Sequence, residues 1–202
     1  MSILVPLFPL DVVLFPGSPL PLHIFEPRYK EMVGECLDQK KVFGIVRLEE
    51  NKIAEVGCTA EILAVTKKYD DGRMDIVTEG RERFEILEVN EERSFLQGQI
   101  NYFEDTPEIT PVPEQNRLIS LHNEILTIVG AEPATPDPDD PHLTFTLAAS
   151  LPLDMDFKQM LLGVRSEAER TASLLKYYEA MVPSLRRAIT TRKKAGGNGH
   201  AG

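Results

Sequence analysis

The sequence of 202 residues has only two cysteines, Cys36 and Cys58, which are too few for a disulfide framework. It also lacks any apolar run near the ~20 residues that a membrane-spanning helix needs. The apolar stretch Ile3–Leu10 is interrupted by proline, follows no basic region and precedes no small-residue cleavage site, so it does not read as a signal peptide. These features predict a cytoplasmic protein with no membrane partner.

Basic residues are also scarce, with 22 Lys and Arg against 32 Asp and Glu and a net charge of −10. Broad binding to nucleic acid or anionic lipid needs a basic footprint, so nucleic acid is not the expected partner. Residues 183–202 are the exception, because they hold five basic residues and no acid. We interpret this tail as a solvated helix end, and the alternative is an RNA-binding protein that uses the tail.

Common catalytic signatures are missing as well. The sequence has no Gly-Lys dipeptide, which excludes a Walker A loop, and it has neither a G-x-S-x-G elbow nor an H-E-x-x-H motif. Its histidines and cysteines have no metal-ligand spacing, so no metal or other cofactor is predicted. Two alternatives stay open, a cysteine nucleophile paired with a distant histidine and a small-molecule or hydrolytic site of unrecognised type.

Strand signals dominate before residue 105. We predict strands over 3–7, 20–25, 42–48, 59–69, 73–79, 83–89 and 95–103, with a turn at 15–18. One helix begins at Pro27, and its apolar spacing places Cys36 in the core. Several short strands and one helix in about 105 residues indicate a small closed or half-closed barrel.

Helical spacing dominates after residue 105. We predict helices over 114–129, 143–150 and 155–164, the last with Asp154 as N-cap, and a further helix opened by a capping box at 166–169. Pro183 should kink that helix or begin another. The fold class is therefore α+β. It divides into a barrel subdomain over 1–105, a helical subdomain over 106–194 with a mobile loop at 131–142, and a disordered tail over 195–202.

Several segments together resemble one known family. They are PLFPLD at 6–11, VVLFPG at 12–17, LPLHIFEPRY at 20–29, FGIV at 43–46, EGRERF at 79–84, LPL at 151–153 and KQMLL at 158–162. They resemble the N-terminal, substrate-binding domain of Lon protease, especially its stand-alone bacterial relatives, and also the Lon-like domain of cereblon. The resemblance covers about residues 1–182.

The resemblance implies a PUA-like β-barrel with one helix, followed by a C-terminal helical bundle. It also implies a protein-recognition module that binds unfolded or degron-bearing polypeptide segments in protein quality control. The implied partners are unfolded or misfolded client proteins and a separate protease. In Lon the ATPase and the Ser/Lys peptidase lie in further domains, so we expect this chain not to be an enzyme. The oligomeric state is not predicted.

The candidate peptide-binding site is an apolar groove between barrel and helices. Its predicted apolar lining is Phe15, Pro16, Phe25, Tyr29, Phe43 and Phe84. Its predicted polar rim is Glu26, Arg28, Arg81 and Arg83. Such a groove would anchor an extended apolar peptide through side-chain pockets. The alternative is that the aromatic side chains fill the core and the arginines pair with Glu26, Glu79 or Glu82.

Overall fold

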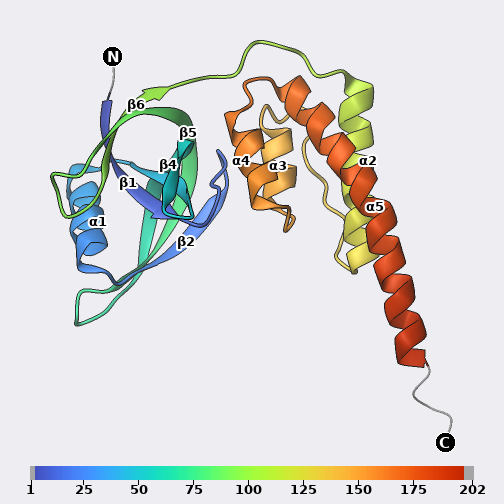
Figure 1. Ribbon diagram of the computed structural model, residues 1–202, viewed down its shortest axis with the longest axis horizontal. Helices are drawn as coiled ribbons and strands as arrows, with labels where there is room; N and C mark the ends of the chain where they lie inside the picture. The colour runs from blue at the N-terminus through green and yellow to red at the C-terminus, as the bar shows by residue number, and fades with distance from the viewer. Residues whose placement is uncertain (1–2, 198–202) are drawn as a thin grey trace, which may run out of the picture. The chain divides into compact units, whose positions relative to one another are not determined.

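The structure, a computed structural model, describes the backbone of residues 3–197 and the side chains of residues 3–191 (Figure 1). Over that range it is a mixed α+β fold with one six-stranded sheet and five helices. The elements are β1 (Ile3–Leu10), β2 (Pro19–Ile24), α1 (Pro27–Gln39), β3 (Phe43–Glu49), β4 (Lys52–Lys68), β5 (Met74–Asn90), β6 (Gln97–Tyr102), α2 (Val112–Val129), α3 (Leu143–Ala149), α4 (Met155–Gly163) and α5 (Glu167–Gly197). None of the helices in the described range is long and apolar enough to cross a membrane.

The chain divides into two compact units. The first unit contains residues 1–105 and 148–164, and the second contains residues 106–147 and 165–202. Helix α4 therefore belongs with the strands, although it follows α2 and α3 in the sequence.

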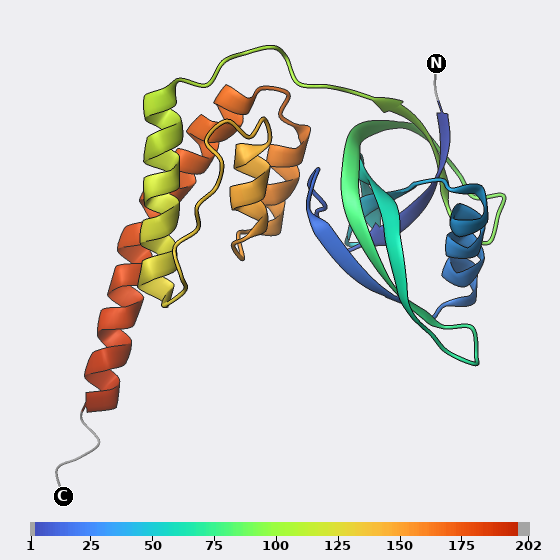
Figure 2. The same cartoon turned by 180° about the vertical axis from the view of Figure 1, so that it is seen from behind.

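The strands of the first unit follow the order β2-β5-β4-β3-β1-β6. β1 and β3 are parallel, and the other pairs are antiparallel. β6 also pairs with β5, so the hydrogen-bonded series β5-β4-β3-β1-β6 returns to β5. Figure 2 shows the curved path of these strands from behind.

One continuous strand, β5, replaces the two that we predicted over 73–79 and 83–89. Gly80 suggests a break in the sequence, but here it lets the turn at residues 15–18 pack directly on the strand. Its N–H donates to the Ser18 carbonyl (3.0 Å), and its carbonyl accepts from Gly17 N–H (2.9 Å). A Cβ at residue 80 would lie 2.1 Å from the Phe15 carbonyl oxygen, so the contact requires glycine.

The core of the first unit lies inside the curved sheet. A cluster of buried side chains comes from four strands: Val5, Leu7, Val46, Phe84 and Ile100. Helix α1 adds Tyr29, Met32, Val33 and Cys36 as its buried face. The predicted core position of Cys36 is thus confirmed.

The N-terminus of helix α4 is fixed by polar contacts. Asp154 caps its first turn, because its carboxylate accepts from the N–H groups of Asp156 (3.0 Å) and Phe157 (3.1 Å), which confirms the predicted N-cap. On β3, the buried Arg47 donates to the Asp156 carboxylate (2.5 Å). These contacts hold the N-terminus of α4 beside the end of β3.

In the second unit, α2 packs against α5. Their contact surface includes a buried polar pair, in which His122 Nδ1 lies 3.0 Å from the Tyr178 hydroxyl. Near the start of α5, the fully buried Arg170 pairs with Glu167 and lies 4.2 Å from the centre of the Phe145 ring. These contacts place polar groups inside the unit, each with a partner.

α5 continues through Pro183, where we expected a kink or a second helix. The proline is exposed, so water can reach the carbonyl that its missing N–H leaves unbonded. The helix includes residues 195–197, which we predicted to be disordered. Residues 198–202 of that predicted tail, and the basic side chains of Arg192, Lys193 and Lys194, lie outside the described residues.

Candidate functional site

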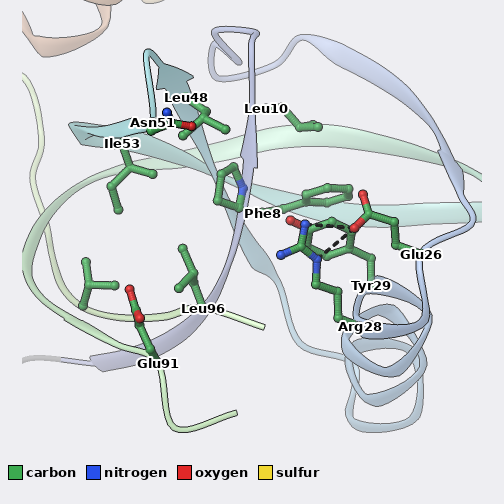
Figure 3. A pocket seen from close by; sticks show the side chains of 12 residues that line it. Phe8, Leu10, Glu26, Arg28, Tyr29, Leu48, Asn51, Ile53, Glu91 and Leu96 are labelled. Atoms are coloured by element: carbon green, nitrogen blue, oxygen red, sulfur yellow. Dashed lines mark hydrogen bonds and ion pairs between the residues drawn. The ribbon is translucent and has the colours of Figure 1, made fainter. Parts of the chain in front are cut away.

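A pocket of about 540 Å³ opens on the first unit (Figure 3). This volume is within the range of about 300–1,000 Å³ that is usual for ligand pockets. The lining comes from β1, the start of α1, the turn between β3 and β4, and the connection from β5 to β6. The lining residues are Phe8, Pro9, Leu10, Glu26, Arg28, Tyr29, Leu48, Asn51, Ile53, Val89, Glu91 and Leu96.

Two stacked aromatic rings form the rigid part of this lining. The Phe8 and Tyr29 ring centres are 4.0 Å apart at an interplanar angle of 28°. Pro27 starts α1, and Tyr29 in its first turn is thereby directed toward β1. Both side chains are more than nine-tenths buried, and burial raises the pKa of the Tyr29 hydroxyl, which stays neutral near pH 7.

The polar rim consists of Asn51, in the turn between β3 and β4, and of charged groups on two opposite sides of the pocket in Figure 3. On one side, Arg28 Nε donates to Glu26 Oε2 (2.9 Å), and the guanidinium lies 4.6 Å from the centre of the Tyr29 ring. This pair is internally neutralised. On the other side is Glu91, which forms no ion pair with any described side chain.

The lining also exposes apolar side chains. Leu48 and Val89 are each 37% exposed, and Leu10, Ile53 and Leu96 are partly buried. The lining residues include no histidine, cysteine, serine or lysine. Such a surface can bind apolar side chains and fix the polar groups beside them, but it offers no nucleophile with an adjacent base.

The structure brings three of the predicted site residues together at this pocket: Glu26, Arg28 and Tyr29. Four others are buried inside the first unit, namely Phe15, Pro16, Phe43 and Phe84. Phe84, for example, packs against the glycine backbone of β3 and β4. These four side chains fill the core, which is the alternative that the sequence left open.

Phe25 and Arg81 lie on the surface and do not line the pocket. Phe25 is 59% exposed, and its ring centre is 5.9 Å from that of His23. Arg81 is paired with Glu61 (2.5 Å) and with Glu79. The pairing of Arg81 with Glu79 is one that the alternative interpretation named.

Arg83 is only 5% exposed and holds the end of α4 on β5. Its Nη1 donates to the carbonyl oxygens of Leu162 (3.0 Å) and Val164 (2.7 Å), and its Nη2 pairs with the Asp105 carboxylate. The guanidinium also lies 4.7 Å from the centre of the Phe103 ring. Arg83 is therefore occupied by the protein itself.

Sequence reasoning missed most of the pocket lining. Phe8 and Leu10 lie in the PLFPLD segment that carries the family resemblance, so that segment was the available signal. Leu48 and Val89 sit at strand ends next to acidic turns, and nothing in their spacing separates them from ordinary strand residues. They are brought together by pairings between strands that are distant in the sequence.

The two cysteine thiols are poorly suited to act as nucleophiles. Cys36 and Cys58 are free and buried. Burial raises the pKa of Cys36 to about 11 and that of Cys58 to about 12, so almost no thiolate forms at neutral pH. Within the described part of the chain, no group of three or more His, Cys, Asp or Glu side chains is placed to hold a metal ion.

The family model described as the ATP-dependent protease La (LON) substrate-binding domain matches residues 4–179. The chain belongs to the Lon substrate-binding domain family. The match includes all twelve lining residues of the pocket and extends over parts of both structural units.

Whole Lon proteases are similar to this Lon substrate-binding domain over only part of their length. The Lon protease of Parabacteroides distasonis is 30% identical over 63% of this chain and 16% of its own length. Lon protease 1 of Hydrogenovibrio crunogenus is 27% identical over 87% of this chain and 23% of its own length. The chain therefore spans less than a quarter of these relatives, and the match does not extend to their catalytic parts.

Solved structures support the same fold. A Lon N-terminal domain protein from Xanthomonas campestris has a TM-score of 0.71 and 24% identity, covering 87% of this chain and 98% of that one. The N-terminal domain of a Mycobacterium avium complex Lon protease has a TM-score of 0.69 and 17% identity over the same two shares. At these identities the likeness concerns the fold.

Proposed function

We propose that this Lon substrate-binding domain is a non-catalytic recognition module that binds apolar segments of unfolded or degron-bearing polypeptides in its Phe8–Tyr29 pocket. The observation that carries the proposal is the open, largely apolar pocket with a sparse polar rim, in a chain of this family. We further propose that it serves protein quality control in the cytoplasm and passes its clients to a separate protease. Its two free cysteines suit a reducing compartment.

The strand pairings support a finer description of the scaffold. The series β5-β4-β3-β1-β6 returns to β5, as expected for a PUA-like barrel, and the packing of α2 on α5 suits a helical bundle. Phe8 on the paired strand β1 and Tyr29 in the first turn of α1 are held in place, so little conformational entropy is lost at these two rings on binding.

Main-chain pairing with a client at the free edge of β2 is not part of this proposal. Within the described residues β2 pairs only with β5, so its other edge carries no strand. Two of the six residues of β2 are prolines, Pro19 and Pro21. The two prolines have no N–H, so this edge offers few donors to an added strand. We therefore expect recognition to depend on side chains.

The test is an NMR titration of the isotope-labelled chain with a permanently unfolded protein, reduced and carboxymethylated α-lactalbumin, in the absence of nucleotide. We expect saturable shifts that cluster at residues 8–10, 26–29, 48–53 and 89–96. Saturable binding with shifts confined to other surfaces would reject the pocket, and the absence of binding to the folded chain would reject the function.

A matched pair of variants sharpens this experiment. Leu48→Ser removes an exposed lining leucine, whereas Leu63→Ser removes a 50% exposed leucine on β4 outside the pocket. Losing part of the burial of one leucine should cost about 1 kcal/mol, or roughly fivefold in affinity. Leu48→Ser should show this loss and Leu63→Ser should not, and equal effects would contradict the assignment.

A further inference from the structure

A second hollow adjoins the pocket and is markedly acidic. It has a volume of about 410 Å³ and shares Val89 and Glu91 with the first pocket. Its other charged lining residues are Glu88 and Glu92, and it contains no basic residue. The exposed Leu4, at 55% exposure, supplies apolar surface.

The charges around the two hollows are unbalanced. Among the described lining residues there are four acids and one base, and the base, Arg28, is already paired with Glu26. Glu88, Glu91 and Glu92 are exposed and form no ion pair with any described side chain. Arg93, which follows them, is held by Glu31 and Glu35. Three uncompensated negative charges therefore lie beside the apolar lining.

This proposal rests on the proposed function and narrows its substrate class. We infer that the pocket selects apolar polypeptide segments flanked by lysine or arginine and rejects those flanked by aspartate or glutamate. A bound segment that places an apolar side chain in the Phe8–Tyr29 pocket and continues past Val89 enters the field of the three glutamates. A lysine or arginine of the segment can form an ion pair with these glutamates, whereas an aspartate or glutamate of the segment is repelled by them.

The experiment uses three labelled peptides with the same apolar core, flanked on both sides by Lys, Gln or Glu, and fluorescence anisotropy with the full chain. We expect the Lys-flanked peptide to bind about tenfold more tightly than the Glu-flanked one at low salt, with the Gln-flanked peptide between them. The difference should shrink as salt is raised, because exposed charges are screened.

Two triple variants test whether Glu88, Glu91 and Glu92 cause the preference for the Lys-flanked peptide. The triple variant Glu88→Gln, Glu91→Gln, Glu92→Gln should abolish the preference, so that the Lys-flanked and Glu-flanked peptides bind with equal affinity. The matched control, Asp38→Asn, Glu55→Gln, Asp70→Asn, removes the same charge from exposed sites outside both hollows and should keep the preference.

The possible results distinguish the proposed function from the proposed charge selection. If none of the peptides binds, the proposed function fails and the inference fails with it. If all three bind equally, the function stands and the charge selection is wrong. If both triple variants weaken the preference equally, it arises from the net charge of −10 and not from this site, and the inference is overturned.

Discussion

Replacing Arg83 should separate α4 from the sheet of the first unit. Arg83→Met keeps most of the aliphatic side chain and removes the guanidinium. The carbonyl oxygens of Leu162 and Val164 then lose their donor, and the Asp105 carboxylate loses its ion pair. Because Arg83 is only 5% exposed, water can replace these contacts only after local opening.

The expected cost follows from that burial. Hydrogen bonds to a charged group are typically worth about 1.5–3 kcal/mol each, so losing the two that Arg83 donates to Leu162 and Val164 should cost about 3 kcal/mol or more, and the Asp105 side chain, at 24% exposure, adds less. Arg81, two residues earlier on β5, is the internal control. It is 40% exposed and pairs with Glu61 and Glu79, and pairs of this kind are worth about 1 kcal/mol or less.

The assay is urea unfolding of both methionine variants beside the parent chain, combined with amide hydrogen exchange of residues 155–164. Arg83→Met should lower the unfolding free energy of the first unit by about 3 kcal/mol or more and accelerate exchange across α4. Arg81→Met should change neither by much. Equal, small effects of the two variants would refute the claim that Arg83 fastens α4.

Three further predictions concern single residues. Asp154→Ala should cost about 1 kcal/mol in urea unfolding through loss of the α4 cap, whereas Asp154→Asn, which can also cap, should cost little. In the same urea assay, Gly80→Ala should lower the free energy of unfolding by about 3 kcal/mol or more, because the added methyl group would collide with the Phe15 carbonyl. The control Gly34→Ala, which has open space around it in α1, should raise the free energy of unfolding by up to about 1 kcal/mol. Burial lowers the pKa of His122, so the unfolded chain binds this proton more readily and stability should fall as pH drops below about 6.5. Unfolding measured from pH 5 to pH 8 should show a shallower slope for His122→Asn than for the parent.

Local signals made several elements predictable. Pro27 and the apolar spacing after it define α1, and Asp154 marks the start of α4. The Asp70-Asp71-Gly72 turn joins β4 and β5, where Gly72 has the positive φ (81°) that the turn requires. These features depend on neighbours in the sequence. The continuity of β5 does not, because Gly80 is kept in the strand by the distant turn at residues 15–18.

In the candidate site, too, some residues could be predicted from their sequence neighbours and others only from distant contacts. Glu26, Arg28 and Tyr29 were predictable because one helix start places them together. Phe15 and Phe25 look alike in the sequence, yet Phe15 is 1% exposed and Phe25 is 59% exposed. The turn that contains Phe15 packs on β5, whereas Phe25 follows the end of β2, so only the three-dimensional pairing distinguishes core from surface.

The charge beside the pocket also bears on why the pocket is open. The connection from β5 to β6 borders both hollows through Glu91, and it is anchored beside them because Arg93 pairs with Glu31 and Glu35 on α1 and Phe95 is buried. Drawing this segment across Leu48 and Val89 would break these contacts and would bring carboxylates without an ion-pair partner among the described residues toward apolar surface, which is costly. The glutamates thus oppose closure of the pocket by the protein's own chain. A ligand that brings its own cation would pair with these carboxylates, so the charges beside the lining favour the segments that we expect to bind there.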